Sequence, residues 1–180
     1  MITYPVGQEP DFWDPNPADA RHRFALGRIG GSSPSKPPLI VIGMNPSRAR
    51  ESESDRTVNR VIRASEEIGG YDGWLMLNLY PERSPKPSAL GGYDRGRSDA
   101  NCAAIVQVLR QLGATEVLGA WGNMGGSATL RRALSDVRAL LAGIGVHVFT
   151  MDPLTRQGNP RHPQPPGRPL PMLGPKAYLP

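Results

Sequence analysis

The sequence predicts an α/β fold, a three-layer α/β/α sandwich around a central, mainly parallel sheet of four strands. Short apolar runs alternate with amphipathic helical segments between residues 39 and 149. The apolar runs are continuous rather than alternating, which is typical of strands buried on both faces. Strands and helices that alternate at this spacing favour parallel strands joined by right-handed crossovers.

The first half of this pattern is a strand, a helix and a second strand. The run "LIVIG" predicts a buried strand at 39–43. Residues 56–68 carry apolar side chains on one helical stripe, and the following "GGYDG" is typical of a helix end. The run "WLMLNL" predicts a second strand at 74–79, which Pro81 ends.

The second half adds two helices and two strands. Residues 98–112 are helical by period, open with an N-cap candidate and stop at Gly113. The run "EVLGAW" predicts a strand at 116–121. A long amphipathic helix is expected at 127–145, and "VHVF" at 146–149 completes the sheet.

The length of 180 residues predicts one domain, 1–180, that is large enough to bury a core. Residues 1–38 and 152–180 are rich in proline and glycine, so we expect either ordered loops that wrap over the sheet or partly mobile arms. The N-terminus lacks a signal-peptide pattern, and no window is apolar enough to span a membrane. We therefore expect a soluble cytoplasmic protein, and a monomer.

Basic residues exceed acidic ones, with a net charge of +5 and a sequence pI of about 9.8. All basic residues except Lys36, Lys86 and Lys176 are arginine. The planar guanidinium suits phosphate groups and base edges, so this bias favours a nucleic acid or a nucleotide as partner. A GC-rich genome would also produce an arginine-rich protein.

Cysteine and histidine usage gives no sign of a metal or another cofactor, and we expect none. The single Cys102 excludes a disulfide framework and a multi-cysteine zinc or iron–sulfur site. The three histidines, His22, His147 and His162, are too scattered to predict a metal site by spacing.

Polar side chains follow each strand of the predicted sheet. Asn45 and Ser47 follow the first strand, Asn78 stands at the end of the second, and Trp121-Gly122-Asn123 ends the third. The segment "LTRQGNPRHP", which carries His162, follows the fourth. Ligands bind beyond the carboxyl ends of strands in open parallel sheets. We therefore predict a site at this edge, with the side chains of Asn45, Asn78 and His162 in one pocket.

Each of these features also has a purely structural interpretation. Asn-Pro-Ser is an ordinary turn sequence, Asn78 could tie down a neighbouring loop, and His162 could face solvent. The glycine-rich "WGNMGGS" could be a simple connecting turn before a helix or could present backbone N–H groups to an anion. The arginines near the first strand could be a solvated helix face or could contact phosphates. The candidates for phosphate or nucleic-acid contact are Ser47, Arg48, Arg50, Arg60, Arg83, Gly122, Asn123, Ser127 and Arg161.

Six short motifs, taken in order, resemble the bacterial and phage domain-of-unknown-function family 1643. They are "GMNPS", then Asp55, Thr57 and Arg60, then "LNLYPERSPKP", "SDAN", "AWG" and "LTRQGNPRHP". The likeness runs from about residue 23 to residue 163. The chain departs from the family pattern at three places: Arg56 replaces a usual proline, Gln164-Pro165 replaces Leu-Tyr, and an Asn-Asp pair is spread over Asp99 and Asn101.

A more distant likeness is to the uracil-DNA glycosylase superfamily, which has a four-stranded parallel α/β/α fold. The motif Gly43-Met44-Asn45-Pro46 resembles its first motif, where the Asn or Asp positions the attacking water. Asn78 falls where that superfamily reads the uracil edge, and His162-Pro163 resembles its last motif, whose histidine supports charge on the departing base. Trp121-Gly122 is similar to the end of its third strand. The cysteine count rules out that superfamily's iron–sulfur branch.

The resemblance implies a DNA glycosylase-like hydrolase that acts on a flipped base, either modified or normal. Its role would lie in DNA repair or phage defence, and its partner would be DNA rather than RNA. Asn45 and His162 are the candidate catalytic residues. The candidate base-binding residues are Gly43, Met44, Asn78, Tyr80 and Trp121, with Tyr80 or Trp121 stacking on the base. Two alternatives stay open: a non-catalytic module that binds a nucleotide, a modified base or a nucleic acid, and a hydrolase of free nucleotides or nucleosides.

Overall fold

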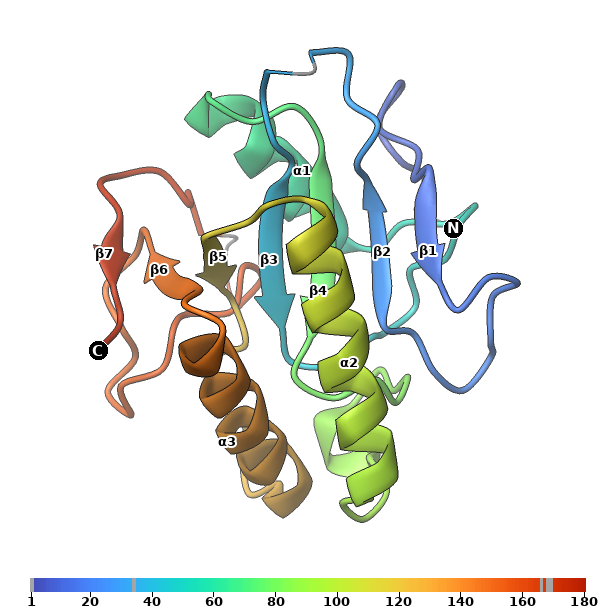
Figure 1. The fold of residues 1–180 in the computed structure, drawn as a ribbon, viewed down its shortest axis with the longest axis vertical. Coiled ribbons are helices and arrows are strands. Elements are labelled where there is room, and N and C mark those ends of the chain that lie inside the picture. The colour runs from blue at the N-terminus through green and yellow to red at the C-terminus, as the bar shows by residue number, and fades with distance from the viewer. Residues whose placement is uncertain (1, 34, 166, 168–169) are drawn as a thin grey trace.

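The computed structural model describes residues 2–33, 35–165, 167 and 170–180. Within that part of the chain, one sheet of seven strands in the order β1-β2-β4-β3-β5-β6-β7 is flanked by three α-helices (Figure 1). The strands are β1 (Phe12–Asp14), β2 (Ala25–Arg28), β3 (Leu39–Gly43), β4 (Trp74–Asn78), β5 (Glu116–Gly119), β6 (His147–Thr150) and β7 (Ala177–Tyr178). The helices are α1 (Arg56–Ile68), α2 (Arg95–Gln111) and α3 (Ala128–Gly143), with a 3₁₀ turn η1 (Pro87–Ala89).

The four strands that the sequence predicts form the centre of this sheet. β3 pairs in parallel with β4 on one side and with β5 on the other, and β5 pairs in parallel with β6. The register of β3 and β4 runs from Leu39 opposite Trp74 to Gly43 opposite Asn78. The predicted α/β class is confirmed, and the last residues of these strands lie at one edge, here called the carboxyl edge.

The sheet is larger than expected and is mixed. β2 pairs antiparallel with β4, β1 pairs antiparallel with β2, and β7 pairs antiparallel with β6. These strands come from the segments 1–38 and 152–180, which the sequence suggested were loops or arms. They are only three, four and two residues long, too short for a period-2 pattern to reveal. Their pairing covers the open edges of β4 and β6.

Helices cover both faces of the sheet (Figure 1). α2 and α3 pack on one face, where Ile105, Leu109 and Leu130 meet Leu75 and Leu77. α1 packs on the other face, where a second core includes the sheet residues Val41, Trp74 and Met76 together with Val58 and Ile62 of α1. Because side chains alternate along β4, Asn78 lies on the α1 face with Trp74 and Met76.

Each helix begins at a side chain that caps it. Asp55 accepts from the Val58 N–H, Asp94 from the Arg97 N–H, and Ser127 from the Leu130 N–H. α2 begins at Arg95, before the predicted residue 98, because Asp94 supplies the cap and the first turn is polar. None of the helices in the described ranges is long and apolar enough to cross a bilayer.

Candidate functional site

Two adjoining cavities lie at the carboxyl edge of the central strands. The outer cavity has a volume of about 740 Å³ and the inner one about 50 Å³. The outer cavity is lined by Met44, Asn45, Ser47, Thr57, Ser84, Pro85, Pro87, Gly122, Asn123, Thr155, Arg161, His162, Gln164 and Pro165. The inner cavity is lined by Arg23, Gly43, Met44, Asn45, Ser47, Asp55, Thr57, Val58, Met76, Asn78 and His162. Asn45, Asn78 and His162 thus line the same inner cavity. Residues that also line the outer cavity, Asn45 and His162 among them, join the two.

Asn78 carries a buried amide that the protein does not satisfy. The residue is 1% exposed, and its Nδ2 has no hydrogen-bond partner among the described residues. A buried donor without a partner costs about 1–3 kcal/mol, so such groups are rare unless a ligand or water completes them. The side chain lines the inner cavity, whose volume is enough for a few waters or for the edge of a ligand. The structure therefore does not use this amide to tie down a loop.

Gly43 leaves room for that amide. A Cβ at this position would lie 3.1 Å from Met76 Cε and 3.3 Å from Asn78 Oδ1. Any side chain here would push on Asn78 and fill part of the inner cavity, since Gly43 itself lines it. The glycine that ends "LIVIG" thus contributes space to the site rather than a contact of its own.

Asn45 is held by the loop that follows β4. Its Nδ2 donates to the carbonyl oxygens of Ser84 at 2.9 Å and Pro46 at 3.0 Å. The backbone continues this link, because Ser84 N–H donates to Pro46 O at 2.8 Å. The side-chain amino group of Asn45 is therefore occupied, and its side-chain oxygen, Oδ1, is the atom that can accept a hydrogen bond from a ligand or a water in the cavity. This arrangement combines the turn interpretation of Asn-Pro-Ser with a place in the site.

His162 is half-buried at the junction of the two cavities. Its Nδ1 lies 3.1 Å from the backbone nitrogen of Gln164 and 3.1 Å from the Gln164 carbonyl oxygen. Burial lowers the pKa of His162 below the ordinary histidine value, because the imidazolium would lose hydration. The ring is accordingly neutral near pH 7 and has one N–H to donate.

The loop that carries His162 is tied to the end of β5. Thr155 Oγ1 donates to Asn123 Oδ1 at 2.8 Å, and Asn159 Nδ2 donates to the same oxygen at 3.2 Å. Asn159 Oδ1 in turn accepts from Trp121 Nε1 at 3.3 Å. These contacts explain how a histidine twelve residues beyond the end of β6 (Thr150) returns to the carboxyl edge.

Gly122 allows the close approach of this loop. Its φ is +67°, and a Cβ there would lie 2.9 Å from His162 Cβ. Its N–H donates to Pro160 O at 2.9 Å. Gly122 was predicted as a phosphate contact, but its backbone N–H is already taken, so its role here is to accommodate His162.

We expect His162 to titrate with a midpoint below pH 6.5. As the pH falls below 6.5 the unfolded chain protonates this residue more readily than the folded chain, so folded stability decreases through that window and levels off below the folded pKa. Two-dimensional NMR of the histidine ring carbons, assigned with His162→Gln, measures this midpoint. A midpoint at or above 6.5 would contradict the burial of the ring.

Tyr80 and Trp121, the two expected stacking residues, do not line either cavity. Tyr80 is fully buried on the α2 face, stacks on Tyr93 and accepts a hydrogen bond from the Asp94 N–H at 3.1 Å. Trp121 is 2% exposed and belongs to the same core. Apart from His162, the described residues that line the two cavities include no aromatic ring. Neither ring is placed to stack on a base in these two cavities, so the expected stacking role stays a prediction that this structure does not support.

Arg60 also lies away from the site. It is 7% exposed and its guanidinium donates to the carbonyl oxygens of Leu170 and Pro171, with Glu67 also nearby. Arg60 thus joins α1 to the C-terminal segment. Its expected contact with a phosphate is not compatible with these bonds.

Three other predicted arginines, two after the first predicted strand and one after the second, surround a third cavity of about 490 Å³, here called the arginine cavity. Arg48, Arg50 and Arg83 line it together with Ser47 and Ser84. Glu51 and Glu53 also line it. Arg83 Nη2 donates to Ala49 O at 2.9 Å and to Arg48 O at 3.3 Å.

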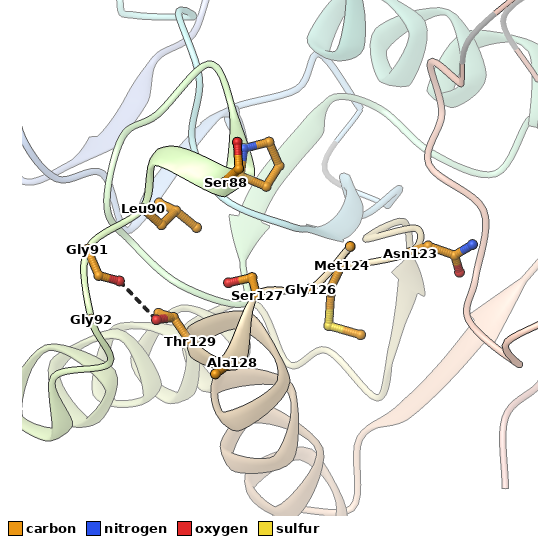
Figure 2. Close-up of a pocket in the computed structure, with 12 residues that line it drawn as sticks. Ser88, Leu90, Gly91, Gly92, Asn123, Met124, Gly126, Ser127, Ala128 and Thr129 are labelled. Carbon is orange, nitrogen blue, oxygen red and sulfur yellow. Dashed lines mark hydrogen bonds between the residues drawn. The ribbon is translucent and has the colours of Figure 1, made fainter.

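A fourth cavity of about 620 Å³, here called the glycine cavity, lies where α3 begins. Figure 2 shows Gly91, Gly92, Gly126 and Ser127 around it, with the Thr129 hydroxyl donating to the Gly91 carbonyl at 2.9 Å. Ser127 caps α3 through its own hydroxyl, so the predicted contact of that hydroxyl with an anion competes with the cap. Asn123 lines both this cavity and the outer cavity.

A family model described as "Protein of unknown function (DUF1643)" matches residues 23–164, more than half of the chain. The chain belongs to the DUF1643 family. The comparisons with curated proteins and with solved structures found no match. The segment that this family model covers contains every residue that lines the inner cavity.

The DUF1643 site contains residues for which sequence reasoning gave no role. Arg23 is 5% exposed, lines the inner cavity and donates through Nη1 to Ala49 O at 2.7 Å. Thr57, Ser84 and Thr155 line the outer cavity. Thr57 and Thr155 stand inside the motifs that resemble the family, and that position was the available signal. Arg23 precedes an unrecognised strand, so no pattern pointed to it.

Proposed function

We propose that this DUF1643 protein is a nucleic-acid base-processing enzyme, a DNA glycosylase-like hydrolase that releases a base from its sugar. The observation that carries this proposal is the buried amide of Asn78, whose Nδ2 has no hydrogen-bond partner in the described part of the chain and which lines a cavity together with Asn45 and His162. An amide presents a donor and an acceptor side by side, which matches the edge of a base. The distant likeness to the uracil-DNA glycosylase superfamily supports the same roles for the three residues.

The chemistry needs few groups. Hydrolysis of an N-glycosidic bond breaks the bond between the base nitrogen and the sugar carbon, and a water oxygen forms the new bond to that carbon. Negative charge develops on the leaving base and positive charge on the sugar. If Nδ1 of His162 accepts from the Gln164 N–H, the opposite ring nitrogen carries the proton and can donate to a base oxygen. Asn78 would read the base edge.

Asn45 is the candidate to hold the attacking water. Its amino group is occupied by Ser84 and Pro46 carbonyls, so its own carbonyl oxygen can accept a hydrogen bond from that water. The proton that the water loses balances the one that the base takes up on leaving. The described residues of the outer cavity include no tyrosine or tryptophan, so the base would pack against Met44, Pro85 and Pro87.

A second candidate, a non-catalytic module that binds a base or nucleotide, is favoured by one observation. Asp55 is the one carboxylate among the residues that line the two cavities, and both of its oxygens are engaged. They accept from Val58 N at 2.9 Å and from Ala49 N at 3.3 Å. Asp55 thus already holds the first turn of α1 and the backbone of residue 49, which favours a structural role over that of a base, and a pocket of this kind could recognise a ligand without turnover.

A panel of oligonucleotides that carry normal, deaminated and hypermodified bases separates the two candidates. The proposed enzyme yields a free base and an abasic site from at least one member of the panel. A binding module retains the oligonucleotide without releasing a base. Mass spectrometry of the released bases and alkaline cleavage at abasic sites provide the readout.

A further inference from the structure

We propose that the outer, arginine and glycine cavities form one groove that holds a single strand of DNA, with a backbone phosphate at Arg50 and Arg83. This inference rests on the proposed function and names its substrate class, a polymer rather than a free nucleotide. The base-reading site then lies in the middle of the groove, and the chain of the substrate continues on both sides.

The three cavities adjoin one another. The outer cavity shares Ser47, Ser84 and Pro85 with the arginine cavity. On its other side it shares Pro87 and Asn123 with the glycine cavity. The shared walls place the arginines at one end, the entrance to Asn78 and His162 in the middle, and the glycine-rich backbone at the other end.

The arginine end gathers guanidinium groups that no ion pair engages within the described ranges. Arg50 and Arg83 line the arginine cavity, and Arg23 lies beside them in the wall of the inner cavity. Arg23 Nη1 and Arg83 Nη2 donate to the same Ala49 carbonyl oxygen, so two guanidinium groups converge on one acceptor. The Nε–H of Arg23 is buried without a partner in the described part of the chain. None of Arg23, Arg50 and Arg83 appears in an ion pair among those residues.

Burial first and the neighbouring guanidinium second lower the pKa values of two of these arginines. Burial, with a further contribution from Arg83, lowers the pKa of Arg23 to about 10. Burial and the neighbouring Arg50 lower the pKa of Arg83. Like charges held together in this way are relieved when an anion binds between them. A phosphate diester fits because guanidinium groups bind its oxygens in pairs, although Glu51 and Glu53 on the same wall reduce the net charge.

The distribution of charge favours a strand over a free nucleotide. Among the described residues, the middle of the groove carries one arginine in its outer wall, Arg161, which is exposed and donates to Pro153 O at 2.8 Å. The described residues that line the glycine end include no charged side chain. A free nucleotide would fill the outer cavity, whose volume is in the range of an ordinary ligand site, and would leave the two flanking cavities empty. A strand occupies all three, with a phosphate at the arginine end, outside the reading site.

The test is the affinity of the intact protein for fluorescein-labelled deoxythymidine oligomers of one to ten nucleotides, measured by anisotropy at several salt concentrations. We expect affinity to rise with length until the groove is filled and the single nucleotide to bind at least tenfold more weakly than the longest oligomer. Arg50→Gln should weaken binding of the longest oligomer roughly tenfold and reduce the salt slope by about 0.7, the value for one lost phosphate contact on a single strand. Arg110→Gln, an exposed arginine at the far end of α2, is the matched control and should change neither.

Affinity that does not depend on length, or an equal effect of Arg50→Gln and Arg110→Gln, would overturn the inference. The outcome is separable from that of the proposed function. Length-dependent binding without base release would support the groove and contradict the proposed enzyme activity. Base release from single nucleotides, with no dependence on length, would support the enzyme activity and contradict the groove.

Discussion

Replacing Asn78 with alanine is expected to abolish the discrimination between bases while leaving the folded protein at least as stable as the wild type. The Nδ2 of Asn78 makes no hydrogen bond to any residue that the structure describes, and burial of such a group costs about 1–3 kcal/mol. Alanine removes this penalty, at the expense of a slightly larger inner cavity. A residue kept for stability would behave in the opposite way.

The loss of recognition should be large. A site built to pair with polar groups of a base loses roughly 100- to 1000-fold in turnover of its preferred substrate when one such donor is removed. Competition between oligonucleotides that differ in one base measures the discrimination, and urea unfolding measures the stability. Asn59→Ala, which removes an asparagine that contacts Thr3 O and lines neither cavity, is the control. Strong destabilisation by Asn78→Ala with unchanged base preference would show that Asn78 is structural.

Replacing His162 with alanine is expected to lower base release about 100- to 1000-fold, with only a few-fold change in the affinity for the oligonucleotide. The reason is that its neutral ring donates to charge that develops on the leaving base, which is absent before the bond breaks. His162→Gln keeps a neutral donor of similar reach and should retain part of the activity.

Single-turnover kinetics and equilibrium binding together separate these effects. His147→Ala removes an exposed histidine at the first residue of β6, at the opposite end of that strand, and serves as control. An equal loss of binding and of turnover in His162→Ala would mean that this residue only holds the ligand. Unchanged turnover would remove it from the proposed reaction.

The sequence predicted the centre of the fold because its strands are buried on both faces. A strand such as β3, with all five residues buried, leaves a continuous apolar run that can be recognised. The edge strands β1, β2 and β7 lack that signal, since they are short and gain their stability by pairing with β4 and β6. The class was therefore predictable, whereas the size of the sheet and its mixed pairing were not.

The same distinction applies to the site. The place of a segment in the fold predicts which edge of the sheet it reaches, and the structure brings the segments of Asn45, Asn78 and His162 together there. The direction of a single side chain depends on packing, which the sequence does not show. Tyr80 points into the α2 face, and Arg60 reaches the carbonyls of residues 170 and 171. Arg23 reaches the site because β2, which follows it, pairs with β4. No local pattern in the sequence predicts that pairing.

The measurement that tests the central claim most directly is the mass spectrometry of bases released from the oligonucleotide panel by the wild-type protein and by Asn45→Ala. We predict that the wild type releases one class of base and leaves abasic sites in equal number, and that Asn45→Ala binds the same oligonucleotide but releases far less. Retention of the panel without any released base would contradict the enzyme and leave a binding module. Equal release by the two proteins would show that Asn45 does not hold the attacking water.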